Sequence, residues 1–286
     1  MDKTSRWLNG FKSGPNHTAQ TISVTGGKGG VGKTSMALKM AQTFADKGKK
    51  VLLIDCDYNL SNTAIKLGLP INNQNIYGLV SGQKNFYQCI TRYHGFDLLS
   101  ACNGDLKLFD KQIIFEQLVI DMIEGHKEEY DYILLDCPAG IARESLVLNS
   151  LSDHRIFVVT PDKSSITDSY SLMKILKHRF NVNENHLLVN MYLNESQYLR
   201  VVKTLSETAE NFLGTRTFVL GGLKRLDIEF TRFDKFLMSR ENSSLQNNFL
   251  KMLKVFADRL PEQRNVSQDF SKKPLEEFMQ DAGELS

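Results

Sequence analysis

The residues with the clearest chemical meaning form one glycine-rich run near the N-terminus. Gly27-Lys28-Gly29-Gly30-Val31-Gly32-Lys33-Thr34 matches the pattern G-x-x-x-x-G-K-[ST], and it lies between an apolar segment and a helix-forming one. Glycines let the backbone turn tightly and aim its N–H groups at a phosphate, while the start of the following helix adds positive potential. Lys33 is then placed to reach the β- and γ-phosphates, and the Thr34 hydroxyl to ligate Mg²⁺. The run predicts a phosphate-binding loop that continues into Ser35.

Carboxylates follow two other apolar segments. Asp55-Cys56-Asp57 comes after the run VLLI, and Asp136-Cys137-Pro138-Ala139-Gly140 comes after YILL. Phosphoryl transfer needs mainly positioning and charge neutralisation, so carboxylates around one Mg²⁺ suffice. Open parallel sheets bind their ligands at the carboxyl ends of the strands. A single Asp after a strand is usually a cap or turn residue, but in register with a phosphate loop these carboxylates predict a shared site.

The elements that must position these residues alternate along the chain. Short apolar runs are separated by helix-length segments, and several runs are apolar at nearly every position, as strands buried on both faces must be. Such a β-α rhythm predicts a single doubly wound, mostly parallel sheet of the α/β class, with helices on both faces. The strands are expected at 21–26, 51–55, 96–100, 132–136, 156–160, 187–191 and 218–222, and the helices at 34–47, 111–126, 165–179 and 195–213.

Composition bounds the remaining possibilities. The chain has 286 residues, 41% hydrophobic and 24% charged, with a formal net charge of +2, which is ordinary for a folded globular protein. No apolar run approaches the roughly 18 residues that span a bilayer, and the polar start gives no signal peptide. Four cysteines without zinc-like spacing indicate reduced thiols and a cytoplasmic protein. We expect one ATPase-type domain over 21–260, between a flexible segment at 1–20 and an acidic, flexible tail at 261–286.

Lys28, at the start of the loop, has no role in an ordinary phosphate loop. With it, the run resembles the deviant Walker A signature K-G-G-x-G-K-[ST] of the MinD/ParA family of P-loop ATPases. In that family the first lysine reaches across an ATP-dependent homodimer to the phosphates bound by the other subunit. The resemblance further implies that Asp57 orients the attacking water, that Asp55 supports the magnesium shell, and that Asp136 is the Walker B carboxylate.

Two phrases outside the ATP site resemble the flagellar branch of the family, the FlhG, FleN and YlxH group. They are Thr160–Tyr170 (TPDKSSITDSY) and Leu188-Val189-Asn190-Met191, and in the family this Asn contacts adenine. Asn75–Ile90 also resembles the short helical pair of that group. Such proteins regulate flagellar number or placement, and they work with an FlhF-type GTPase, flagellar switch proteins or a flagellar transcription regulator.

The chain departs from the branch at two places. The N-terminus lacks the Gln-Ala pair of the usual GTPase-stimulating helix, although Trp7, Leu8 and Phe11 keep an apolar cluster that suits either a partner-binding helix or a tail. The run Gly221–Asp227 lacks the proline usual after the last strand, which puts adenine contacts from that loop in doubt.

Three further alternatives stay open. A stripe of Leu245, Phe249, Leu253, Phe256 and Leu260 suits either a helix packed on the sheet or a peripheral membrane helix over 245–260. Small basic clusters, at 174–179 and 224–225, would serve a ParA-type partition ATPase that binds DNA non-specifically, although clusters of this size are usually solvated. A module that merely holds nucleotide is the third alternative. An iron–sulfur site is disfavoured because no CxxC pair exists.

Overall fold

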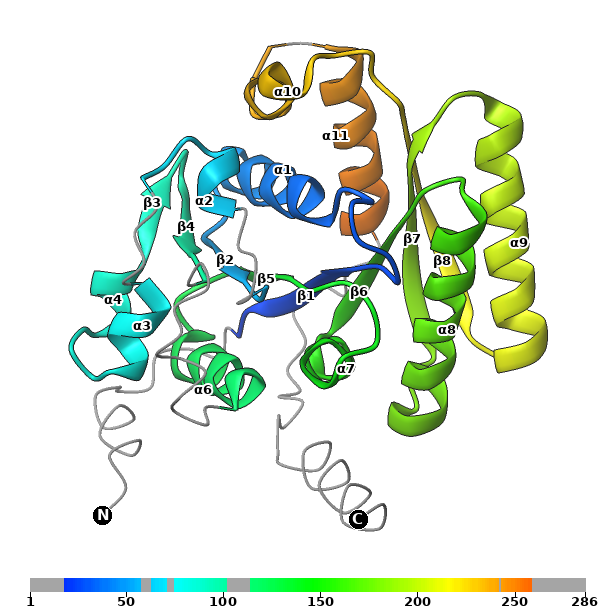
Figure 1. Ribbon diagram of the computed structural model, residues 1–286. Coiled ribbons are helices and arrows are strands. Elements are labelled where there is room, and N and C mark those ends of the chain that lie inside the picture. Colours follow the sequence, from blue (N-terminus) through cyan, green and yellow to red (C-terminus); the bar gives the residue numbers. More distant parts are fainter. Residues whose placement is uncertain (1–17, 58–62, 71–74, 102–113, 242, 259–286) are drawn as a thin grey trace.

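The protein, described in a computed structural model, is built on one eight-stranded sheet (Figure 1). The structure describes residues 18–57, 63–70, 75–101, 114–241 and 243–258. The strand order is β3-β4-β2-β5-β1-β6-β7-β8, and every neighbouring pair is parallel except β3 with β4. The strands are β1 (Gln20–Thr25), β2 (Val51–Asp55), β3 (Thr91–Tyr93), β4 (Phe96–Leu99), β5 (Tyr132–Asp136), β6 (His154–Val159), β7 (Glu184–Tyr192) and β8 (Arg216–Lys224).

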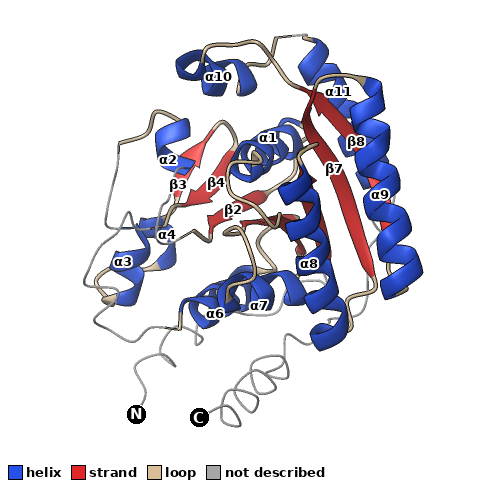
Figure 2. Cartoon of the chain, turned by 45° about the vertical axis from the view of Figure 1, so that its right-hand side comes forward, coloured by secondary structure: helices blue, strands red, loops and turns tan. Residues whose placement is uncertain are grey.

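Helices cover both faces of the sheet (Figure 2). On one face, α1, α10 and α11 join a core that includes Ile22 and Val24 of the central strand. On the other face, α3, α4 and α6 pack over β2, β4 and β5, while α8 and α9 pack over β6 and β7. The helices are α1 (Lys33–Asp46), α2 (Thr63–Lys66), α3 (Asn75–Val80), α4 (Phe86–Cys89), α6 (Phe115–His126), α7 (Arg143–Leu151), α8 (Lys163–Phe180), α9 (Glu195–Leu213), α10 (Phe230–Leu237) and α11 (Ser244–Ala257).

The predicted fold class is confirmed, and the differences lie in short elements. All seven expected strands are present with ends shifted by up to three residues, and α9 has its expected bounds. Strand β3 was not predicted from the sequence, because Thr91-Arg92-Tyr93 contains no apolar run and pairs antiparallel at the sheet edge. Helices α2, α7 and α10 were not predicted either. The expected helical pair within Asn75–Ile90 is present as α3 and α4.

Helix α11 contains the described part of the apolar stripe near the C-terminus. Leu245, Phe249, Leu253 and Phe256 are each at most 8% exposed, and they belong to the core that includes Leu188 and Leu220 of the sheet. The stripe therefore covers the apolar face of β7 and β8 in this structure, as a helix packed on the sheet does, and contact with a membrane stays a prediction. Leu260 lies outside the described residues. Across the described ranges, no helix is both long and apolar enough to cross a membrane.

Two other expectations concern parts of the chain that the structure does not describe. The apolar cluster of Trp7, Leu8 and Phe11 falls in 1–17, and the whole acidic tail, predicted at 261–286, falls in 259–286. The loop that follows Asp57, at 58–62, is likewise outside the described residues. These predictions stay as they were made.

Candidate nucleotide site

The glycine-rich loop joins the end of β1 to the start of α1, at the carboxyl edge of the parallel strands. Gly32 precedes the helix with a φ of 99°, in the left-handed region that favours glycine. At Gly27, a Cβ would lie 2.1 Å from the backbone carbonyl carbon of Asp168, because α8 packs directly on the loop there. The two glycines thus meet different requirements. Gly27 allows the close approach of α8, and Gly32 allows the left-handed backbone conformation.

Lys33 and Asp136 lie together at the base of the loop. The Lys33 ammonium donates to the carbonyl oxygen of Lys28 at 3.5 Å, and burial lowers the pKa of Lys33. Burial also raises the pKa of Asp136 from 3.8 to about 6, against the opposing effects of a hydrogen bond with Thr34 and the charge of Lys33. A carboxylate with so high a pKa is in an environment that lacks sufficient positive charge, which a bound cation would supply.

The donors around Asp136 fit a hard divalent cation. Its Oδ1 is buried with no hydrogen-bond partner among the described residues, and the Thr34 hydroxyl lies against the same carboxylate. Oxygen donors of this kind, one or two from the protein and the rest from phosphate and water, are what Mg²⁺ takes in nucleotide sites.

Asp55 and Asp57 occupy the end of the neighbouring strand. Asp55 is paired in register with Asp136, accepts a hydrogen bond from the Thr63 hydroxyl, and accepts the Asp57 backbone N–H at 3.0 Å. Asp57 lies close enough to influence both Lys33 and Asp136. The structure therefore brings the three predicted carboxylates to one edge. Thr63, which begins α2, is a partner of Asp55 that was not predicted from the sequence.

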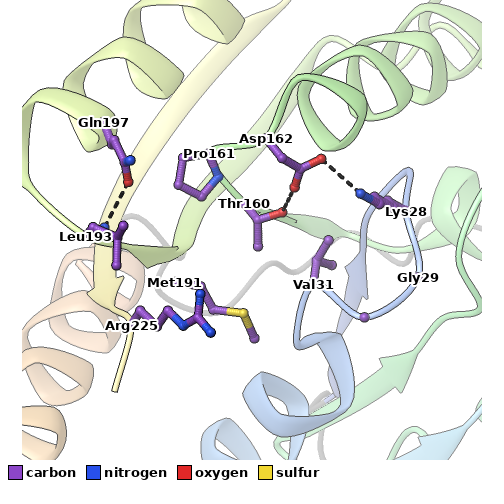
Figure 3. Close-up of a pocket in the computed structure, with 11 residues that line it drawn as sticks. Lys28, Gly29, Val31, Thr160, Pro161, Asp162, Met191, Leu193, Gln197 and Arg225 are labelled. Atoms are coloured by element: carbon purple, nitrogen blue, oxygen red, sulfur yellow. Dashed lines mark hydrogen bonds and ion pairs between the residues drawn. The ribbon is translucent and has the colours of Figure 1, made fainter. Parts of the chain in front are cut away.

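Lys28 does not extend freely into solvent (Figure 3). Its ammonium lies 3.0 Å from Oδ1 of Asp162 and 2.7 Å from the Ser164 hydroxyl. Asp162 caps the start of α8 by accepting the Ser165 backbone N–H at 2.9 Å. Partial burial acts to raise the pKa of Asp162, but hydrogen bonds from Thr160, Ser164, the Ser165 backbone and Lys28 outweigh it, so the pKa lies well below its usual range.

Asn190 is placed beside the loop rather than in open space. Its side-chain amide donates to the carbonyl oxygen of Val31 at 2.9 Å, and a Cβ on Gly32 would lie 2.5 Å from the amide nitrogen. Asn190 therefore supports the second half of the loop in this structure. Its predicted contact with adenine stays a prediction.

A cavity of about 370 Å³ opens between the loop and the ends of β6, β7 and β8 (Figure 3). Met191 borders it with a φ of 59°, an unusual backbone conformation for a residue with a side chain, at an irregularity in the pairing of β7 with β8. The cavity is lined by residues of the phosphate loop, of the end of β7 and of the segments that follow β6, β7 and β8: Lys28, Gly29, Gly30, Val31, Thr160, Pro161, Asp162, Met191, Leu193, Gln197 and Arg225.

Several of these residues had no role predicted from the sequence. The capping role of Asp162 had a local signal, since Asp is one of the preferred N-cap residues and this one stands at a strand-to-helix junction. Arg225 was taken as part of a basic cluster, whereas the structure places it at the cavity. Lys177, His178 and Arg179 form the last turn of α8, where cations are favourable next to the helix C-terminus. Ser35 is buried at the start of α1.

A phosphate loop between a buried strand and a helix, with carboxylates at the ends of adjacent parallel strands, defines the class of P-loop nucleotide-binding proteins. Comparison with known proteins places the chain within that class. The AAA-domain family matches residues 19–189. The septum site-determining protein MinD of Bacillus subtilis is 33% identical over 178 residues. The match covers 61% of this chain and 66% of MinD, so this chain spans slightly under two thirds of the length of that relative.

Two further similarities agree with this assignment. The flagellum site-determining protein YlxH of Helicobacter pylori is 28% identical over 84% of this chain and 76% of its own. The structure of MinD from Pyrococcus horikoshii in complex with Mg-ADP is similar in fold, with a TM-score of 0.67 at 20% identity over 84% of this chain and 96% of the other. The chain belongs to the MinD/ParA family of ATPases and stands close to its flagellar members.

Proposed function

We propose that this protein is an ATP-driven dimerisation switch that regulates the number or placement of flagella. The observation that carries the switch is the position of Lys28. The residue that the family signature assigns to a cross-dimer contact is held within its own chain by Asp162 and Ser164, at the rim of the nucleotide site. A lysine that exchanges an internal partner for the phosphates of a second subunit gives two distinct states, as a switch requires.

The residues around the loop have separable tasks in this proposal. Backbone N–H groups of the loop and the Lys33 ammonium bind the phosphates, while Thr34 and Asp136 would hold Mg²⁺. The bound Mg²⁺ would neutralise charge on the phosphate oxygens. Asp57 is the candidate for orienting the attacking water, as the family resemblance implies, with Asp55 fixing the backbone of Asp57 through the hydrogen bond at 3.0 Å.

Exposed apolar side chains near the site support the dimer. Ile141, in the turn after Asp136, is 54% exposed, and Met191 and Leu193 at the cavity are 39% and 61% exposed. Burying such side chains against a second copy is favourable, by about 25 cal/mol for each Å² of apolar surface removed from water. The dimer face in this proposal therefore contains the nucleotide site itself.

The flagellar output rests on the resemblance to YlxH, whose name describes a flagellum site-determining protein. We place the protein in the cytoplasm, where its partners would be an FlhF-type GTPase, flagellar switch proteins or a flagellar transcription regulator. Peripheral contact with the inner face of the membrane belongs to the same proposal. With the stripe of α11 buried, that contact would require either other residues or the release of α11 from the sheet.

Size-exclusion chromatography with light scattering tests the switch. The wild-type protein with Mg-ATP is expected to dimerise transiently, and Asp57→Ala is expected to accumulate as a dimer because hydrolysis is blocked. Lys28→Ala should bind ATP but stay monomeric. If neither wild type nor Asp57→Ala dimerises with ATP, the proposal is wrong.

A cellular arm tests the output. Deletion of the gene should change the number or position of flagella, and Lys28→Ala should fail to restore them. Normal flagella in the deletion strain, together with salt-sensitive binding of the purified protein to random duplex DNA, would instead favour a partition ATPase.

A further inference from the structure

The central strand of the sheet has one polar face, although it is buried on both sides. Thr21, Ser23 and Thr25 alternate with Ile22 and Val24 along β1, and all five are at most 1% exposed. Ile22 and Val24 belong to the core under α1, so the three hydroxyls face the opposite side of the sheet. A buried polar face on a central strand is unfavourable unless every group finds a partner.

Those partners come from α7 and the turn after it. The side-chain carbonyl of Asn149 accepts the Ser23 hydroxyl at 2.8 Å, and its amide donates to the Thr25 hydroxyl at 3.1 Å and to the Ser145 carbonyl at 2.7 Å. Asn149, Ser145, Ser23 and Thr25 are all 0% exposed. One fully buried amide thus links the strand that leads into the phosphate loop to the helix beside it.

The same network reaches the turn that follows Asp136. The Ser145 hydroxyl donates to the carbonyl oxygen of Pro138 at 3.3 Å, and Gly140 N–H donates to the Gly26 carbonyl at 3.3 Å. In Figure 1, α7 lies directly alongside β1 and β6. The turn at 138–140 is therefore held against the phosphate loop in two ways. One is the backbone hydrogen bond to Gly26, and the other is the series of hydrogen bonds through Ser145, Asn149 and Thr25.

We infer that Asn149 is a positioning residue for the nucleotide response, which sets the place of the 138–140 turn relative to the phosphate loop. The inference rests on the proposed function. Stability alone does not require the arrangement, because a well-packed apolar pair can replace a buried polar one with little loss. Hydrogen bonds are directional, and with both groups of the amide engaged, α7 is held in one register on β1. The turn then occupies a defined position when a γ-phosphate arrives.

The test compares Asn149→Leu with Val147→Ala, a control that also disturbs a fully buried position of α7 but lies outside the network. Affinities for Mg-ADP and for a non-hydrolysable Mg-ATP analogue are measured by calorimetry, ATP turnover and dimerisation are followed, and the melting temperature is recorded. Asn149→Leu should bind ADP within about twofold of wild type, while turnover and ATP-dependent dimerisation fall about tenfold, the equivalent of 1.4 kcal/mol. Val147→Ala should lose thermal stability but keep the wild-type ratio of ATP to ADP responses.

Ser23→Ala provides a milder variant if Asn149→Leu does not fold. It removes one hydrogen bond of the amide and should shift the same responses in the same direction by about threefold. If both network variants lose ADP affinity and the ATP response by the same factor, together with a lower melting temperature, the inference is overturned and Asn149 is a purely structural residue. A wild-type protein that fails to dimerise would instead contradict the proposed function, and the ratio of ATP-analogue to ADP affinity would still test the role of Asn149.

Discussion

The free energy of the buried Asp136 carboxylate leads to a counterintuitive expectation, that removing it stabilises the nucleotide-free protein. Its pKa of about 6 exceeds the ordinary value of 3.8 because burial disfavours the charged form. Each step of one in pKa corresponds to 1.36 kcal/mol, so ionised Asp136 lowers the free energy of unfolding by about 3 kcal/mol at pH 7.5. Asp136→Asn keeps the shape and an acceptor for Thr34 without that charge. The value of about 3 kcal/mol already includes the favourable interaction of the carboxylate with Lys33, which the Asn variant loses.

The pH dependence has a definite sign. Below about pH 4 the carboxyl is protonated in both folded and unfolded states, so it contributes no penalty. Between pH 4 and 6 the unfolded state ionises while the folded state keeps its proton, and the folded wild-type protein progressively loses stability. The advantage of Asp136→Asn should therefore be full above pH 6 and disappear towards pH 4.

Urea unfolding in EDTA, without nucleotide, measures this difference at pH 7.5 and pH 4.5. At the higher pH, Asp136→Asn should be about 3 kcal/mol more stable, or melt roughly 6–12 °C higher, and the gap should shrink at the lower pH. Mg-ATP should then stabilise the wild type but not the variant. Asp121→Asn, at an exposed position of α6, is the control and should show no such pattern. A variant that is no more stable than wild type at pH 7.5, or a gap independent of pH, would refute the argument.

Three further changes give expectations that follow from single contacts. Asp162→Asn keeps the cap of α8 but weakens the ion pair with Lys28, so the ATP concentration for half-maximal dimerisation should fall. The decrease should be no more than about fivefold, because an exposed ion pair contributes at most about 1 kcal/mol. An unchanged titration would show that this contact has no bearing on the switch. Gly27→Ala should cost about 3 kcal/mol of stability and abolish nucleotide binding by forcing α8 off the loop, whereas Gly29→Ala, with open space around its Cβ, should be tolerated in a thermal melt. Phe256→Ala should lower the free energy of unfolding by about 4 kcal/mol, since this ring is 0% exposed, and a loss below 1 kcal/mol would mean that α11 is only loosely attached to the sheet.

The fold and the edge that carries the site could be predicted because their signals are local. Runs such as VLLID and YILLD must be buried on both faces, and their alternation with helical segments leaves the doubly wound sheet as the consistent arrangement. The loop from Gly27 to Thr34 has a meaning wherever a strand precedes it and a helix follows. Asp55 and Asp136 could be assigned to one edge because parallel strands end together, and the register confirms that they are neighbours.

The partners of individual polar side chains could not be predicted, since nothing local specifies them. Lys28 and Asp162 are 134 residues apart, and Asn190 reaches Val31 across 159. Asn149 looks like an ordinary polar residue of a short helix until β1 presents the hydroxyls of Ser23 and Thr25 to it.

The sequence by itself determined which faces of the chain are apolar and where a phosphate would bind, because periodicity and the glycine-rich loop are properties of adjacent residues. Only the tertiary structure decided what covers each face. The stripe of α11 suited either a protein core or a membrane, and the apolar face of β7 and β8, which needs cover, holds it in the core of this structure. The tertiary structure likewise decided the partner of Lys28. The fold brings the N-cap of α8 beside the phosphate loop, so the Lys28 ammonium pairs with the Asp162 carboxylate there.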